Sequence, residues 1–189
     1  MRAAQDLLRH LAARGVSACF ANPGTSEMHF VAALDAAPSI RPILCLFEGV
    51  ATGAADGFGR IAGNPALTLL HLGPGLGNGF ANLHNAYRAR TPIVSLIGEH
   101  ATYHRVNDPP LASDISALAK PVSTWLKTVE NPEQLAVLGG QAFDAARKSG
   151  PAALILPADI AWSEAPSAPP PELASSNAPA WSGDLDAAA

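Results

Sequence analysis

The hydrophobic positions of the chain follow two alternating patterns, one helical and one typical of strands. Apolar residues recur at helical spacing from Ala4 to Leu11 and stop near Gly15, and an apolar run of strand length follows from Val16 to Ala21. We therefore expect a helix and then a strand. The same alternation predicts further helices over 26–36, 49–62 and 76–90, and further strands over 43–47, 66–71 and 93–97.

A polar stretch interrupts this alternation over 99–113 and contains the adjacent Pro109 and Pro110. A loop of this length in a compact domain is usually functional or mobile. The pattern then resumes with a predicted strand over 122–129, a helix that begins at Asn131 and Pro132 and stops at Gly150, and a last strand over 152–156.

Strands that are apolar on both faces and alternate with helices are typical of a parallel sheet covered on both sides. The predicted fold class is therefore α/β, with an open, mainly parallel sheet and helices on both faces. Residues 1–162 form one predicted domain. Residues 163–189 have the Pro, Ala and Ser content of a linker, and 183–187 resemble a helix start, so we expect the beginning of a missing next domain there.

Composition narrows the function classes. The 189 residues carry 12 Lys plus Arg and 16 Asp plus Glu, a formal charge of -4, and only 15% are charged. This balance disfavours nucleic-acid binding and the 48% hydrophobic content disfavours disorder. No apolar stretch approaches the length of a bilayer span, so we expect no membrane insertion. Cys19 and Cys45 each lie in an apolar run, where a buried free thiol is the ordinary interpretation, and this predicts a reducing, cytoplasmic setting.

Two acidic segments follow predicted strands. Asn22–Glu27 lies at the carboxyl end of the first strand, where open α/β sheets bind ligands, although a simple turn and helix cap is the more frequent outcome. Glu48 follows the strand over 43–47 and opens a helix rich in Gly and Ala. A carboxylate there can simply favour the helix dipole. Burial between the strand and the helix would also take the carboxylate out of water and raise its pKa, as proton-transfer groups require.

A third segment, 71–79, is rich in glycine and leads from a strand into a helix. It fails as a dinucleotide fingerprint, because the final glycine of Gly-x-Gly-x-x-Gly falls on Asn78. A phosphate-binding turn remains an alternative.

Together these segments resemble the N-terminal, pyrimidine-binding domain of thiamine diphosphate enzymes, the group that contains acetolactate synthase and benzoylformate decarboxylase. The resemblance runs from about Arg2 to Asp159, and it rests on the order and spacing of several motifs. The motifs are Asn22-Pro23-Gly24-Thr25, Glu48 with the following 49–60, Gly73-Pro74-Gly75 with Asn78, and Thr91-Pro92-Ile93 leading to Gly98.

The resemblance implies that Glu48 matches the glutamate that hydrogen-bonds N1′ of the aminopyrimidine ring. A carboxyl that shares a proton with this nitrogen favours the imino form of the 4′-amino group, which then removes the C2 proton of the thiazolium ring. The substrate implied is a small 2-oxo acid. The cofactor-binding residues implied are Pro23, Gly24, Thr25, Glu48, Gly73, Pro74, Gly75 and Asn78. Of these, Thr25 and Asn78 either contact the substrate or cofactor or simply brace their turns.

His71 is the second candidate catalytic residue. Benzoylformate decarboxylase has a histidine at the resembled position, whereas Gly73-Pro74-Gly75 is the acetolactate synthase form, so the subfamily signals disagree. A histidine at a strand end is more often structural than an acid or base. His100 and His104 lack metal-ligand spacing, and we predict no metal site in this chain.

Half of the resembled active site is missing. In the family a second α/β domain with a Gly-Asp-Gly motif holds the diphosphate and Mg²⁺, and this chain contains no Gly-Asp-Gly. The chain is then either the subunit of a split decarboxylase of the sulfopyruvate or phosphonopyruvate type, or a piece of a longer enzyme, which the linker favours. We expect a complementary diphosphate-binding domain or subunit as partner, a homo-oligomer, and no activity from the chain alone. A non-catalytic interaction module and a nucleotide-binding enzyme remain the alternatives.

Overall fold

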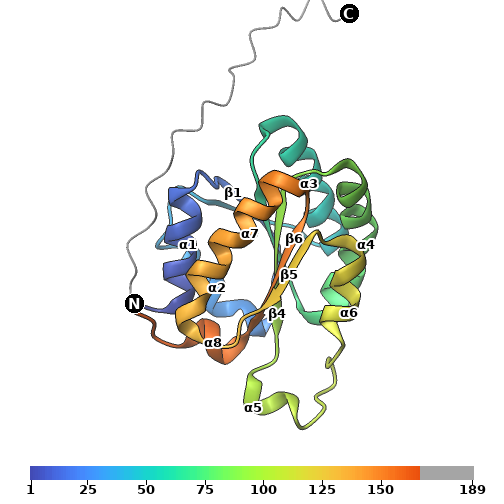
Figure 1. Ribbon diagram of the computed structural model, residues 1–189. Coiled ribbons are helices and arrows are strands. Elements are labelled where there is room, and N and C mark those ends of the chain that lie inside the picture. The colour runs from blue at the N-terminus through green and yellow to red at the C-terminus, as the bar shows by residue number, and fades with distance from the viewer. Residues whose placement is uncertain (167–189) are drawn as a thin grey trace, which may run out of the picture.

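The computed structural model describes residues 1–166, which form a six-stranded sheet (Figure 1). All strand pairs are parallel, and the strand order is β2-β1-β3-β4-β6-β5. The predicted fold class, an open parallel α/β sheet, is confirmed. The strands are β1 (Ala18–Asn22), β2 (Arg41–Leu44), β3 (Ala66–Leu70), β4 (Ile93–Glu99), β5 (Trp125–Thr128) and β6 (Ala152–Pro157).

Helices cover both faces of this sheet (Figure 1). One face carries α1 (Ala3–Ala13), α2 (Met28–Leu34), α7 (Leu135–Ser149) and α8 (Ala158–Trp162). The other carries α3 (Glu48–Ala62), α4 (Leu72–Ala89) and α6 (Ile115–Ala119). The short helix α5 (Thr102–Arg105) lies in the loop after β4. Each layer encloses its own apolar cluster, because parallel strands send alternate side chains to opposite faces.

Burial follows the position of each strand in the sheet. Every residue of β3, β4 and β6 is buried, as expected for central strands that are covered twice. The edge strand β2 is largely exposed, with Leu44 72% accessible. The predicted strand over 43–47 therefore lies two to three residues too late, because β2 ends at Leu44 and the large apolar side chains of Leu46 and Phe47 beyond it are exposed.

The glycine-rich segment differs most from the prediction. The helix predicted over 76–90 begins at Leu72, so Gly73, Pro74 and Gly75 form its first turn. Proline fits this position because the first N–H groups of a helix have no acceptor within the helix. Gly75 N–H already donates to the carbonyl of His71 at 2.8 Å. The segment is a helix start and not a turn that precedes one.

Three other predicted elements are shorter or divided. The helix over 26–36 is a 3-10 turn, Thr25–Glu27, followed by α2. The strand over 122–129 consists of a second 3-10 turn, Lys120–Val122, followed by β5. A third 3-10 turn, Pro132–Gln134, precedes α7. The Asn131 side chain caps this turn by accepting a hydrogen bond from Gln134 N–H.

The two ends of the described chain meet. Arg2 and Glu164 form an isolated antiparallel bridge, and Ala165 N–H donates to the carbonyl of Met1 at 3.0 Å. The domain boundary at 162 stays a prediction, and the helix start predicted at 183–187 lies outside the described residues. Within residues 1–166 no helix has the length and apolar character needed to cross a membrane.

Candidate functional site

The predicted site residues follow strands β1, β2 and β3 at the carboxyl edge of the sheet. The strand order reverses at β1, because β1 lies between β2 and β3. In open α/β sheets ligands bind at such a reversal, where the loops that leave two neighbouring strands diverge. Glu27 follows β1 and His71 follows β3, so the reversal places these two residues, 44 positions apart, side by side.

Glu48 is the first residue of α3 and is 7% exposed. The side-chain amide of Asn78, in α4, donates to its Oε2 at 3.0 Å. Oε1 has no hydrogen-bond donor among residues 1–166, and it faces Gly75, where an added Cβ would lie 3.0 Å away. One oxygen of this carboxylate is therefore held by Asn78, while the other has no donor in the described part of the chain.

Two further hydrogen bonds fix the spacing of the helices that carry this pair. Thr52 Oγ1, in α3, lies within hydrogen-bond distance of the carbonyl of Gly79 in α4, at 3.1 Å, and of the carbonyl of Glu48 in its own helix, at 3.0 Å. Asn82 Nδ2, in α4, donates to the carbonyl of Gly49 at 2.6 Å. Because both bonds join side chain to backbone across the interface, Glu48 and Asn78 are held by rigid elements, which a binding geometry requires.

A second pair lies beside the first. Nδ1 of His71 is 2.8 Å from Oε2 of Glu27, and the same oxygen accepts a hydrogen bond from Gly24 N–H at 2.7 Å. Because Oε2 already accepts this hydrogen bond, Nδ1 of His71 is assigned as the donor to it. Nε2 is then the ring nitrogen through which His71 accepts or gives a proton.

Glu27 is 3% exposed, and its Oε1 is buried without a hydrogen-bond partner among residues 1–166. Burial raises the pKa of this carboxyl, and the contacts from His71 and Gly24 offset only part of the effect. Oε1 of Glu27 lies against Gly98 of β4, where the Cβ of any other residue would overlap it. A Cβ at Gly24 would likewise overlap the His71 ring. Both glycines are therefore required for this pair to form.

The two pairs meet at the start of α4. A Cβ at Gly75 would lie 3.0 Å from Oε1 of Glu48 and 3.4 Å from Cβ of His71. Leu72, between His71 and Gly75, has a φ of 55°, a conformation that L-residues rarely adopt. Its side chain is 1% exposed, so buried packing holds this strained backbone in place beside His71.

The remaining predicted cofactor residues are less closely involved. Gly73 is buried, and an added Cβ would overlap Ser113 of the loop after β4. Pro74 and Thr25 are exposed, and Pro23 is half-buried. In residues 1–166, none of these four donates or accepts a hydrogen bond with Glu27, Glu48 or His71. Their assignment as cofactor ligands stays a prediction.

The histidines of the long loop form no metal site. His100 and His104 contact each other edge to face, with ring centroids 5.6 Å apart. Among residues 1–166 no group of three or more histidine, cysteine or acidic side chains is placed to hold a metal ion.

Glu27 is the residue of the candidate site to which the sequence assigns no role. The segment Asn22–Glu27 is a candidate for ligand binding from the sequence, but the sequence predicts no role for the carboxylate of Glu27. A local signal exists, because Glu27 follows Gly24 by three residues, the spacing at which an acidic side chain returns to the backbone N–H that precedes a helix. Its contact with His71 has no local signal.

Comparison with known proteins agrees with this geometry. The family "Thiamine pyrophosphate enzyme, N-terminal TPP binding domain" matches residues 1–118. The chain belongs to this family. The resemblance inferred from the motifs is thereby confirmed, and thiamine diphosphate is the cofactor of the family.

Individual relatives point the same way. The chain is 60% identical over 166 residues to the Mycobacterium tuberculosis protein named "Putative acetolactate synthase large subunit IlvX", covering 87% of this chain and 32% of that protein. It is 36% identical over 124 residues to benzoylformate decarboxylase of Pseudomonas aeruginosa, covering 65% of this chain and 22% of that protein. Among solved structures, the thiamine diphosphate-dependent 4-hydroxybenzoylformate decarboxylase of Rhodococcus jostii RHA1 superposes with a TM-score of 0.82 at 28% identity.

The match to the Rhodococcus structure covers 88% of this chain and 32% of that one. The chain therefore spans a third or less of the length of these proteins. The family is thus the N-terminal part of larger enzymes, which implies partner domains.

Proposed function

We propose that this chain is the pyrimidine-binding half of a thiamine diphosphate-dependent 2-oxo acid decarboxylase or carboligase of the acetolactate synthase type. The observation that carries the proposal is the state of Glu48. Its carboxylate is buried at the start of α3, with one oxygen held by Asn78 and the other without a donor. That second oxygen is not among the fully buried side-chain atoms that lack a partner in residues 1–166, so a ring nitrogen that carries or shares a proton can reach it.

The residues around Glu48 fit the aminopyrimidine ring of the cofactor. Gly75 carries no side chain beside Oε1 of Glu48, which leaves room for a flat ring to approach. Thiamine diphosphate, when bound, would supply an acidic C–H group and so a carbon nucleophile suited to the carbonyl group of a 2-oxo acid. Glu48 holds and exchanges a proton at N1′ of the pyrimidine, and Asn78 orients the carboxylate for this exchange.

His71 is the proposed acid and base toward the substrate. With Nδ1 held by Glu27, Nε2 gives a proton to an oxygen or carbon atom that gains negative charge, and takes it back later. Glu27 is a positioning residue, because it acts through the imidazole and is itself buried. This assignment favours the decarboxylase relatives, whereas the glycine-rich first turn of α4 follows the acetolactate synthase form.

The proposed partner is a diphosphate-binding domain or subunit that also holds Mg²⁺. Large apolar side chains that neighbour Glu48 in the sequence are exposed, namely Leu46 at 90%, Phe47 at 48% and Val50 at 57%. Such a patch beside a buried carboxylate is typical of a surface that another domain covers. We expect the same surface to support a homo-oligomer. The isolated chain is expected to bind thiamine diphosphate weakly, because the ligands of the charged diphosphate lie elsewhere.

The other interpretations predict different site chemistry. The subunit of a split decarboxylase would use the same residues and would differ only in how the partner is attached. A non-catalytic interaction module would not need a partly unsatisfied Glu48. The nucleotide-binding alternative is disfavoured, because Ser113 covers the backbone at Gly73 that a phosphate would have to approach. The cytoplasmic location stays a prediction.

The test is the Glu48→Gln variant, combined with a complementing diphosphate-binding domain. We expect normal folding but loss of most of the rate of hydrogen–deuterium exchange at C2 of the bound cofactor, since an amide does not exchange the proton at N1′. Asp56→Asn, which neutralises an acidic residue two turns further along α3, is the matched control and should leave exchange unchanged. Wild-type exchange in Glu48→Gln would refute the assignment. Equal thermal melts exclude a folding defect.

A further inference from the structure

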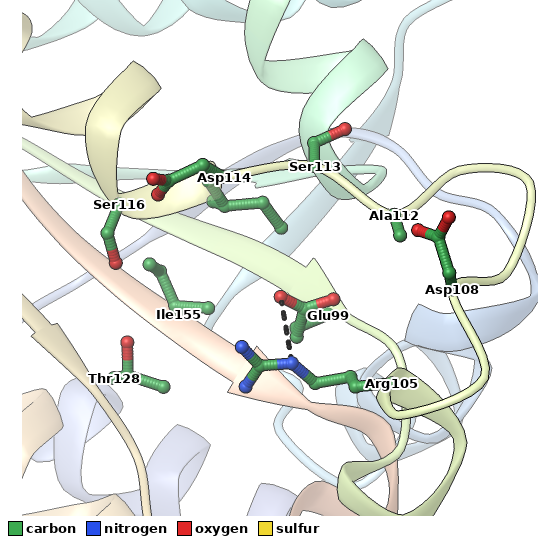
Figure 2. Close-up of a pocket in the computed structure, with 10 residues that line it drawn as sticks. Glu99, Arg105, Asp108, Ala112, Ser113, Asp114, Ser116, Thr128 and Ile155 are labelled. Atoms are coloured by element: carbon green, nitrogen blue, oxygen red, sulfur yellow. Dashed lines mark ion pairs between the residues drawn. The ribbon is translucent and has the colours of Figure 1, made fainter.

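A cavity of about 570 Å³ lies at the carboxyl ends of β4, β5 and β6, under the loop that follows β4. Figure 2 shows Glu99, Arg105, Asp114 and Thr128 around it. Its lining includes neither Glu27, Glu48 nor His71, so the proposed function does not use it.

The loop that covers this cavity is anchored at both ends. Thr102 N–H, at the start of α5, donates to Oδ1 of Asp159 at 3.0 Å. At the other end Ser113 packs on the bare backbone of Gly73, and Asp114 accepts a hydrogen bond from Ala117 N–H at 2.9 Å as the N-cap of α6. The cavity is therefore framed by fixed elements.

Arg105, the one cation in the cavity lining, has a half-exposed side chain and is held at one of its nitrogens. Glu99 is 5% exposed, and its Oε1 accepts a hydrogen bond from His100 N–H at 2.7 Å. Its Oε2 lies 3.8 Å from Nε of Arg105. The two terminal nitrogens of Arg105 have no partner among residues 1–166, and Figure 2 shows the guanidinium between Glu99 and Thr128.

We propose that this cavity is a binding site for a small monocarboxylate that also carries a hydroxyl or ammonium group. The free N–H groups of a guanidinium form a fork that matches a carboxylate in two parallel hydrogen bonds. The hydroxyl groups of Ser116 and Thr128 line the same cavity and are further donors to an anion.

The acidic residues restrict the ligand further. Glu99, Asp108 and Asp114 line the cavity against the single cation Arg105, so the formal charge of the lining is negative. A ligand with two negative charges, such as phosphate, is disfavoured by this balance. A ligand with one carboxylate and a hydrogen-bond donor satisfies both sets of groups, since Asp108 and Asp114 accept from the donor while Arg105 binds the carboxylate.

Three probes of nearly equal size separate these contributions. Propionate carries only the carboxylate, L-lactate adds a hydroxyl group and L-alanine adds an ammonium group. Titration of the full chain, followed by two-dimensional amide NMR, should give saturable shifts around Arg105 with lactate or alanine. The better of the two identifies the ligand class. Propionate should bind several-fold more weakly, and inorganic phosphate should produce no saturable shift at this site.

Two variants and a control test the residues. Arg105→Ala should weaken binding of the better probe by about tenfold or more, a loss typical of one charge-assisted contact. Asp114→Asn keeps an N-cap residue of equal quality, so α6 should remain folded, and the preference for this probe over propionate should fall. Arg88→Ala removes an exposed arginine that does not line this cavity and should bind like the wild type.

Loss of binding in Arg105→Ala with an unchanged thermal melt supports the proposal. Absence of saturable shifts with both lactate and alanine in the wild type would overturn it, as would equal binding in Arg105→Ala. Phosphate binding as tight as that of the better probe would overturn the ligand class.

Discussion

Glu27, which is buried, and His71, which is half-buried, form a pair in which Oε2 of the carboxyl group lies 2.8 Å from Nδ1 of the imidazole. The two residues follow neighbouring strands, and the contact fixes which ring nitrogen of His71 is left for a substrate. The other oxygen of Glu27 is buried against Gly98 without a partner. The pair combines a fixed orientation with a carboxyl group that is costly to ionise, and both properties can be measured.

The first prediction concerns the pH dependence of stability. Burial raises the pKa of Glu27 in the folded state above its ordinary value of 4.5. The folded chain therefore holds this proton to higher pH than the unfolded chain does. The stability that it contributes is fully present below pH 4.5 and is lost as pH rises through the folded pKa.

Glu27→Gln removes this titration. Urea unfolding at a series of pH values should show the wild type losing stability relative to Glu27→Gln as the pH rises above 4.5. Glu133→Gln, which changes an exposed glutamate, serves as the control. A constant difference between wild type and Glu27→Gln across the series would contradict the prediction.

The second prediction concerns Gly98. Gly98→Ala should destabilise the chain by about 1–3 kcal/mol, because its Cβ would overlap Oε1 of Glu27 inside a packed layer. Gly57→Ala is the matched control, since a Cβ there meets nothing within 4 Å and alanine favours a helix interior. Thermal unfolding of both variants gives the comparison.

A double variant tests the cause of the Gly98 effect. In a Glu27→Ala background the carboxyl group is absent, so Gly98→Ala should cost much less than in the wild type. Additive losses in the double variant would show that Gly98 is needed for a reason other than its contact with Glu27.

The third prediction concerns the two thiols, which are both free and buried. Burial raises the pKa of Cys19 to about 12 and also raises the pKa of Cys45. Because the thiolate is the reactive form, iodoacetamide at pH 8 should modify neither residue quickly in the folded chain. Cys19, which is 0% exposed, should react more slowly than Cys45, which is 5% exposed. Mass spectrometry of alkylated peptides measures both rates, and rapid labelling of native Cys19 would refute the packing of β1.

The fourth prediction concerns the packing of Trp162 at the end of α8. Its indole ring lies on the imidazole of His29, with ring centroids 3.0 Å apart. Desolvation lowers the pKa of His29 to about 4, and the charge of Arg2 contributes. Histidine NMR titration should find this value in the wild type. In Trp162→Ala the pKa should return toward 6.5, and an unchanged titration would show that Trp162 does not cover His29.

Much of the fold was predictable because it depends on local patterns. The apolar runs of β3, β4 and β6 have the composition of twice-covered strands, and their alternation with helices specifies a parallel sheet. The exposed strand β2 was misplaced because edge strands lack this signal. The start of α4 was misplaced because glycine and proline are equally compatible with a turn and with the first turn of a helix.

The candidate site also has a part that follows from local sequence and a part that does not. The sequence determined that Glu48 opens a helix directly after the apolar run over 43–47, because an apolar run and a helix start are properties of neighbouring residues. Only the tertiary structure decided that Asn78 holds Glu48, that Glu27 holds His71, and that Gly98 makes room for the Glu27 carboxyl group. These contacts join residues 30 to 71 positions apart, and they exist only because the strand order brings β1, β3 and β4 side by side. Local periodicity carries no information about strand order, since the same helices and strands are compatible with several orders until their side chains pack.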